Sequence, residues 1–150
     1  MEQADVVAYD SEGELVLVVE VKPKLGTNSE WATRMHRNIL AHGLLPSAPF
    51  FLLALPDRFY LWKDKRLPVL EGPTYEVDAS ELLAPYFAKA GVDPETVSEP
   101  GFELLIRSWL ADLMYSSELP QGSAENNGWL VQSGLYEAIR HGNIASEPVR

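Results

Sequence analysis

The sequence predicts an α/β fold, with a mixed β-sheet in the first half of the chain and helices in the second. Short β-branched and aromatic segments separated by turn residues indicate strands over residues 5–9, 14–22, 49–55 and 58–63. An amphipathic segment between them, residues 28–42, has helical spacing. After residue 66, apolar residues recur at intervals of three and four, which is typical of helices.

The first two strands are expected to pair as an antiparallel hairpin. Residues 10–13 (Asp-Ser-Glu-Gly) form a turn in which Gly13 can take a positive φ. Residues 14–22 are almost continuously apolar, as in a central strand that is buried on both faces. Two further strands then follow the helix, which gives the order strand, strand, helix, strand, strand.

Capping residues set the limits of the helices. Asn28 or Ser29 caps the first helix, which we expect to reach about His42 and to end at Gly43. A second helix starts at Asp78 or Ser80 and stops at Gly91. A connector is expected over residues 68–73 and a polar loop over residues 120–127. Two further helices are expected over residues 101–115 and 128–141.

Length and composition suit one globular domain. The chain has 150 residues, 46% of them hydrophobic, which is enough to bury a core. We expect a single domain, with the α/β core in residues 1–66 and a helical extension in residues 67–150. No apolar run reaches the roughly 18 residues that cross a membrane. The N-terminus carries acids where a signal peptide needs bases, so the expected location is the cytoplasm.

The charge is distributed unevenly. The formal net charge is −10, which argues against indiscriminate binding to nucleic acid. Residues 20–66, however, hold eight Lys and Arg against four acids, while the segments on either side are acidic. A basic groove can attract phosphate even in an acidic protein. A mixed, solvated surface explains the same distribution equally well.

Three charged residues are expected to meet at one corner of the sheet. Glu20 and Lys22 stand two apart on a strand, so their side chains share a face. If the hairpin closes around residues 10–13, Asp5 lies across from about residues 18–20. Side chains that face each other in such a ladder lie within roughly 4.5–8 Å.

This corner suits a hard divalent cation. With no cysteine in the chain, a metal must be held by carboxylate, carbonyl or histidine, which favours Mg²⁺ or Mn²⁺. Asp5, Glu20 and the Val21 backbone carbonyl are the candidate ligands. An ion held there polarises a phosphate and lowers the pKa of a bound water. Lys22 is the candidate catalytic lysine, because it can orient the water or balance charge in the transition state.

A structural explanation stands beside this one. Glu20 and Lys22 can be an exposed ion pair worth about 0–1 kcal/mol, and Asp5 can be an ordinary residue at the start of a strand. The D…ExK pattern can then be chance in an unrelated α/β protein.

The hairpin sequence resembles a known family. Residues 4–10 (Ala-Asp-Val-Val-Ala-Tyr-Asp) and 14–22 (Glu-Leu-Val-Leu-Val-Val-Glu-Val-Lys) are similar to the core hairpin of PD-(D/E)XK restriction-endonuclease-like proteins. The similarity is greatest to the nuclease domains of type I restriction motor subunits and to small stand-alone bacterial relatives, and it covers residues 4–63. It implies a restriction-endonuclease-like sheet and metal-dependent cleavage of DNA. Asp5 and Glu20 would be the metal carboxylates, and Lys22 the catalytic lysine.

The resemblance also implies where this chain differs. Relatives usually carry a helix before the first strand, often with a further acid for the metal site, whereas this chain begins almost inside the strand. We therefore expect the N-terminal core helix to be missing. Either the chain is truncated, or the apolar sheet surface that this leaves is covered by another helix, a second copy or a partner protein. The helical half of the chain is expected to pack on the sheet or to form a partner surface. The proline of the family name is Ala4, and the helix after Lys22 lacks the glutamine or tyrosine that relatives often carry there.

Basic side chains flank the proposed centre. Lys24, Arg34, His36 and Arg37 are candidate contacts to the DNA backbone, or the wet face of an amphipathic helix. The first functional interpretation is a Mg²⁺-dependent endonuclease. The alternative is a nuclease fold that has lost catalysis and now binds nucleic acid or assembles a complex.

Overall fold

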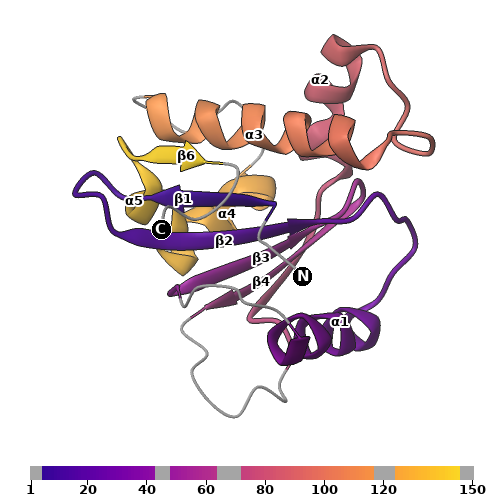
Figure 1. Cartoon of the computed structure of the whole chain (residues 1–150). Coiled ribbons are helices and arrows are strands. Elements are labelled where there is room, and N and C mark those ends of the chain that lie inside the picture. The colour runs from indigo at the N-terminus through magenta and orange to yellow at the C-terminus, as the bar shows by residue number, and fades with distance from the viewer. Residues whose placement is uncertain (1–4, 43–47, 64–71, 117–123, 146–150) are drawn as a thin grey trace.

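The computed structural model of the chain describes residues 5–42, 48–63, 72–116 and 124–145. Six strands form one mixed sheet in the order β5-β4-β3-β2-β1-β6 (Figure 1). The strands are β1 (Val6–Tyr9), β2 (Leu15–Val21), β3 (Phe50–Ala54), β4 (Arg58–Lys63), β5 (Tyr75–Asp78) and β6 (Asn143–Ala145). The helices are α1 (Ser29–His42), α2 (Ser80–Ala90), α3 (Glu99–Tyr115), α4 (Ala124–Ser133) and α5 (Leu135–Ile139). The predicted α/β class with a mixed sheet is confirmed.

Strands β1 and β2 form the predicted antiparallel hairpin. Val6 pairs with Val19 and Val7 with Val18, and the register shifts by one residue at the turn end, between Ala8 and Tyr9. Gly13 in the turn has φ 83°, a conformation that glycine adopts without steric cost.

The segment from β2 to β3 is a parallel crossover through α1. β3 pairs in parallel with β2 and antiparallel with β4. α1 lies on one face of the sheet (Figure 1). Its Ala32 and Ile39 pack there with strand residues that include Val18 and Trp62. The nearly unbroken apolar run of β2 follows from this arrangement, because a strand with helices on both faces has no wet side.

Helices α3 to α5 cover the opposite face of the sheet, and α2 packs against α3. Trp109 and Leu113 of α3, with Trp129 of α4 and Tyr136 of α5, join one core cluster with the alternate strand residues. The expectation of apolar sheet surface left bare for a partner is therefore wrong within the described residues. The expected alternative, that other helices of the chain cover this face, is the one that the described residues support.

Several boundaries differ from the sequence prediction. Edge strands β5 and β6 were not expected, and both are short. The predicted helix over residues 128–141 is two helices, because Gly134 takes φ 87° and interrupts it. α4 begins at Ala124, inside the predicted polar loop. α3 begins at Glu99, where the Ser98 side chain accepts a hydrogen bond from the Gly101 N–H.

Two expectations fall on residues outside the described part of the chain: the Gly43 helix stop and most of the connector over residues 68–73. Among the described helices, none is long and apolar enough to cross a membrane.

Candidate active site

Asp5 and Glu20 meet where β1 begins and β2 ends. The paired register, continued by one residue from Val6 and Val19, sets Asp5 opposite Glu20. The Asp5 carboxylate accepts a hydrogen bond of 2.9 Å from the Val21 N–H. It also shares a hydrogen bond with the side chain of Glu20, which requires a proton on one of the two acids. The juxtaposition expected from hairpin spacing is therefore present.

The environment of Asp5 favours its neutral form. Burial raises the pKa of Asp5 above its usual value, and the hydrogen bond from the Val21 N–H opposes this. The charge of Glu99 raises the pKa further, whereas Lys22 and the hydrogen bond with Glu20 lower it. Two adjacent carboxylates cannot both ionise freely in a half-buried site. A bound cation would remove that conflict.

Glu20 lies near the end of β2, and Lys22 directly follows the strand, with Val21 between them. Glu20 is 2% exposed, Val21 is buried, and Lys22 is half-buried. Alternation along the strand gives Glu20 and Lys22 the same face as Val18, the face that α1 covers. The Lys22 N–H donates to the Ala54 carbonyl at 3.0 Å, which extends the pairing with β3 by one residue. The backbone that carries Lys22 is therefore fixed.

The Val21 carbonyl is directed toward the Asp5 side of β2. Within a strand, the N–H and C=O of one residue point to the same neighbouring strand. The Val21 N–H donates to the Asp5 carboxylate, so its carbonyl faces that side as well. A carbonyl oxygen thus joins the two carboxylates at one edge.

Two acids of α3 extend the negative charge of this corner. The charge of Glu99 acts on Asp5, and that of Asp5 acts on Glu103. Burial raises the pKa of Glu103, and the charge of Asp5 raises it further, while Arg107 opposes both. The first turns of α3 lie at the end of the sheet where β1 begins (Figure 1). These acids were missed from the sequence because they lie more than 90 residues from Asp5, and only the packing of α3 brings them near.

The donor set fits magnesium better than a metal that needs a full protein cage. In the part of the chain that the structure describes, no three His, Asp or Glu side chains are grouped closely enough to hold an ion by themselves. Asp5, Glu20 and the Val21 carbonyl offer three oxygens. Mg²⁺ is commonly held by one or two carboxylates and keeps several waters.

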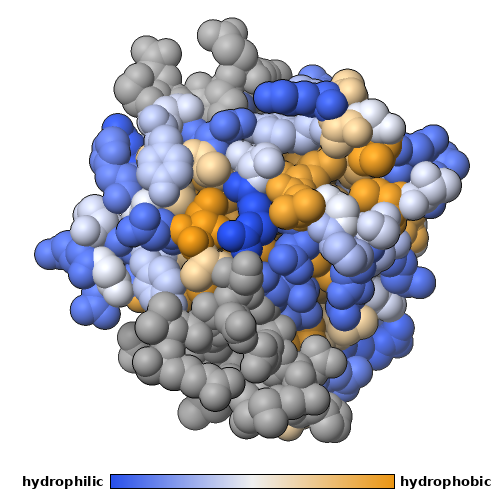
Figure 2. Space-filling model, turned by 45° about the horizontal axis from the view of Figure 1, so that its top comes forward, coloured by the Kyte–Doolittle hydropathy of each residue, from blue (hydrophilic) through white to orange (hydrophobic). Residues whose placement is uncertain are grey.

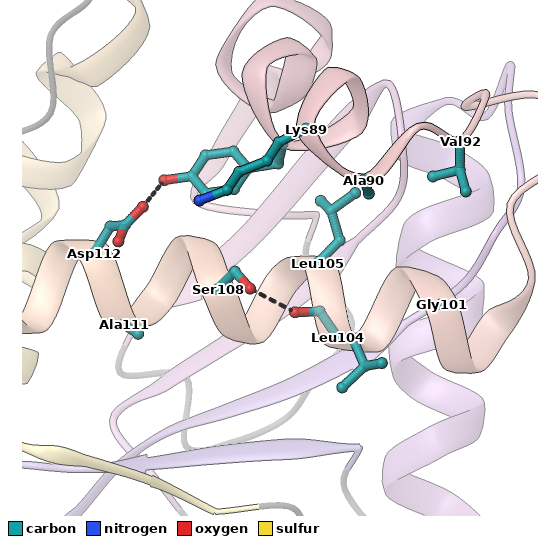
Figure 3. A pocket seen from close by; sticks show the side chains of 10 residues that line it. Lys89, Ala90, Val92, Gly101, Leu104, Leu105, Ser108, Ala111 and Asp112 are labelled. Atoms are coloured by element: carbon teal, nitrogen blue, oxygen red, sulfur yellow. Dashed lines mark hydrogen bonds between the residues drawn. The ribbon is translucent and has the colours of Figure 1, made fainter.

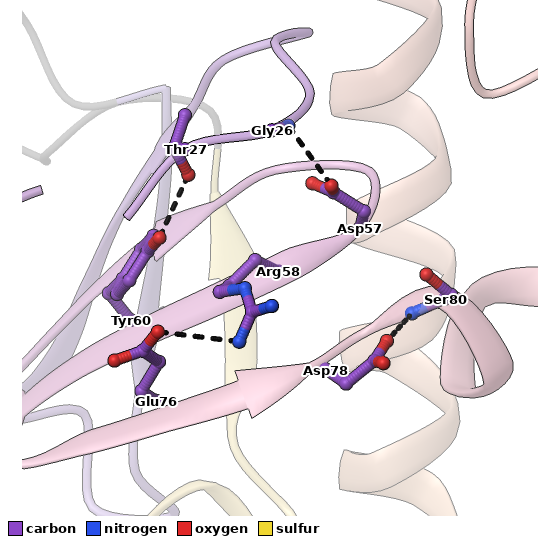
Figure 4. A network of polar contacts seen from close by, with 8 residues as sticks. All are labelled: Gly26, Thr27, Asp57, Arg58, Tyr60, Glu76, Asp78 and Ser80. Atoms are coloured by element: carbon purple, nitrogen blue, oxygen red, sulfur yellow. Dashed lines mark hydrogen bonds and ion pairs between the residues drawn. The ribbon is translucent and has the colours of Figure 1, made fainter. Parts of the chain in front are cut away.

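The segment after Lys22 is tied to the turn between β3 and β4 (Figure 4). The Gly26 N–H donates to the Asp57 carboxylate at 3.1 Å, and Gly26 has φ 73°. The Thr27 and Tyr60 hydroxyls are 2.8 Å apart. The Asp57 backbone carbonyl also accepts a hydrogen bond of 3.0 Å from the Ala79 N–H. One turn residue therefore fixes both the segment after Lys22 and the entry to α2.

The flanking basic residues fall into two groups. Lys24, Arg34 and Arg37 are exposed, and Arg34 lies 3.7 Å from Glu30 in a solvated pair. His36, in contrast, is 3% exposed and stacks on Trp62, with ring centroids 4.0 Å apart. Burial lowers the pKa of His36 to about 4, so it stays neutral near pH 7. The prediction that His36 contacts nucleic acid is corrected, because it belongs to the core beneath α1.

No protein family, curated protein or solved structure matches the chain.

Proposed function

We propose that the chain is a divalent-metal-dependent nuclease that hydrolyses phosphodiester bonds in DNA. The observation that carries the proposal is the contact between Asp5 and Glu20 beside the Val21 carbonyl, with Lys22 on the same strand. These are the residues that the resemblance to PD-(D/E)XK proteins singles out. The position of α3 adds support, because it supplies acids near Asp5, as the N-terminal helix of the family often does.

Asp5, Glu20 and the Val21 carbonyl would hold Mg²⁺ or Mn²⁺. When bound, the ion polarises a phosphate oxygen and lowers the pKa of a coordinated water. Burial makes the ionised form of Asp5 costly without a cation, as its raised pKa indicates. The corner is therefore better suited to a bound cation than to the metal-free state.

Lys22 would supply the positive charge on the substrate side. Its ammonium is a compact charge on a flexible stem, suited to orienting a water or balancing charge on a phosphorane-like transition state. The fixed backbone at Lys22 restricts where that charge can go. Lys24, Arg34 and Arg37 are exposed close by in sequence and would contact the phosphate backbone.

A second candidate is a nuclease fold without catalysis that binds nucleic acid or assembles a complex. The observation that favours it is the lack of a three-residue metal group among the described residues. Two carboxylates that mainly bond one another and a backbone N–H would then be structural. The two candidates differ in metal-dependent turnover.

The test is cleavage of supercoiled plasmid, single-stranded DNA and RNA with Mg²⁺ or Mn²⁺. Wild type is compared with Lys22→Ala and with Lys89→Ala, a control lysine on α2 outside the proposed site. We expect metal-dependent cleavage of DNA, lost by about 100-fold or more in Lys22→Ala and retained in Lys89→Ala. Equal cleavage by Lys22→Ala and wild type would exclude the assigned mechanism. Metal binding without cleavage of any substrate would favour the second candidate.

A further inference from the structure

A groove runs between α2 and α3, on the side of α3 away from the sheet (Figure 3). Its volume is about 540 Å³. Residues on successive turns of α3 line one side of the groove: Gly101, Leu104, Ser108 and Ala111. Tyr86 and Ala90, on the last two turns of α2, line the other side. Most of these side chains are small or apolar. The groove has no part in the site at Asp5.

The groove leaves apolar side chains in water. Leu104 is 66% exposed and Val92 is 43% exposed. Figure 2, with the α3 side turned forward, shows hydrophobic residues gathered on this face. α3 already buries Leu105, Ile106 and Trp109 on its inner side, so it is apolar on two sides. A helix of that kind is usually covered on both, and contiguous exposed apolar surface marks a binding site.

The surroundings of the groove are acidic. Residues 80–115, which form α2, α3 and their connection, carry six Asp and Glu against two Lys and Arg, a net charge of −4. Exposed Asp93 and Glu95 follow Val92 at one end, and exposed Asp112 lies at the other. Lys89 is the one basic residue in its lining as described. An occupant must therefore present apolar groups with positive charge at its flanks.

Tyr86 and Asp112 hold one end of the groove in a fixed form. The Tyr86 hydroxyl donates to the Asp112 carboxylate across the two helices. Burial, followed by this hydrogen bond and the Asp112 charge, raises the pKa of Tyr86 above its usual value. Tyr86 therefore stays a neutral phenol at physiological pH. The Asp112 charge is available to a basic partner, and the helices are already positioned.

We propose that this groove binds an amphipathic helix of a partner protein, with an apolar stripe flanked by Lys or Arg. The lining on α3 runs from Gly101 to Asp112, or roughly 16 Å, which matches three turns of an incoming helix. Gly101, Ser108 and Ala111 leave room for its side chains beside Leu104. An acidic rim disfavours an anionic small molecule. It also disfavours a second copy, because an isologous contact sets like charges against each other.

The test is fluorescence anisotropy at about 0.15 M salt, where long-range attraction is screened. The probe is a labelled 18-residue Leu/Lys peptide with helical periodicity, and a Leu/Glu peptide with the same apolar pattern is its control. We expect the Leu/Lys peptide to bind more tightly. Leu104→Asn should weaken the binding of the Leu/Lys peptide by about 10-fold. Val131→Asn is the matched variant, since Val131 is 56% exposed on α4 outside the groove, and it should bind as wild type does.

Circular dichroism establishes that both variants are folded. Equal affinity for the two peptides, or an equal loss in Leu104→Asn and Val131→Asn, would overturn the proposal. A wild-type dimer that Leu104→Asn dissociates in sedimentation would also overturn it, in favour of a second copy. None of these outcomes depends on nuclease activity.

Discussion

The Asp5 carboxylate accepts the Val21 N–H at 2.9 Å, across 16 residues of sequence. The side chain thereby continues the β1–β2 pairing past Val6, the first residue of β1. This bond holds Asp5 against the strand that carries Glu20 and Lys22. A position that would otherwise be the loose start of a strand is tied to the proposed centre.

Asp5→Asn should keep the fold and remove the charge. The Asn carbonyl oxygen can still accept from the Val21 N–H. Because burial raises the pKa of Asp5, the folded state favours the neutral acid, and metal-free stability declines as pH rises above about 4. At pH 7, metal-free Asp5→Asn should therefore melt at or above the temperature of wild type.

Asp5→Ala provides the contrast, since it removes the acceptor as well as the charge. It should be about 1 kcal/mol less stable than Asp5→Asn, measured by urea unfolding without metal. A metal-free Asp5→Asn clearly less stable than wild type would contradict the account of this site.

Asp57→Ala should loosen the segment that follows Lys22. Loss of the acceptor for the Gly26 N–H should lower cleavage by about 10-fold, with Mn²⁺ affinity unchanged. Asp57→Asn, which keeps an acceptor oxygen, should restore most of the rate. Asp93→Ala is the matched control, because Asp93 accepts a similar turn hydrogen bond from the Glu95 N–H in the connection between α2 and α3. A rate loss in Asp93→Ala as large as in Asp57→Ala would argue against a positioning role.

His36 should make the protein sensitive to mild acid. Its pKa falls from 6.5 to about 4 on burial, so the unfolded chain binds the proton more readily. The stability that depends on a neutral His36 is fully present above about pH 6.5 and is lost as pH falls toward 4. Between pH 7 and pH 5, the Tm of His36→Phe should fall by less than that of wild type, and the difference should be roughly 3 °C or more.

His141→Asn is the control for that comparison. His141 is exposed and has φ 62°, a conformation that Asn tolerates. Its Tm drop should match that of wild type. The same drop in His36→Phe as in wild type would show that His36 is not buried as described.

Gly142→Ala should disrupt the edge of the sheet. A Cβ at Gly142 would lie 1.8 Å from the Tyr9 carbonyl oxygen, so β6 would have to move away from β1. We expect a loss of about 2 kcal/mol or more in urea unfolding. Gly128→Ala in α4 has no neighbour closer than 4.0 Å and should gain about 0.5–1 kcal/mol from helix propensity. Equal effects of the two substitutions would contradict the β1–β6 pairing.

The parts that the sequence predicted are those that local pattern determines. The hairpin register follows from the turn at residues 10–13 and the apolar run of β2, so the meeting of Asp5 and Glu20 could be anticipated. α1 was predicted from its periodicity, but the burial of His36 was not. The direction in which His36 points is set by its packing on Trp62, a strand residue 26 positions away.

The parts that the sequence missed depend on long-range packing. β6 consists of three residues, too short to show alternation, and it forms only because α5 returns the chain to β1. Spacing along the sequence could not place Glu99 and Glu103 near Asp5, because the position of α3 over the sheet is set by tertiary packing.

A nuclease centre at this corner requires that Asp5 and Glu20 hold one divalent ion together. Calorimetric titration of Mn²⁺ into wild type, Asp5→Asn, Glu20→Gln and Lys22→Ala measures this directly. We predict one site in wild type, its retention in Lys22→Ala, and its loss in both carboxylate variants. Mn²⁺ binding that neither Asp5→Asn nor Glu20→Gln weakens, or no binding by wild type, would contradict it.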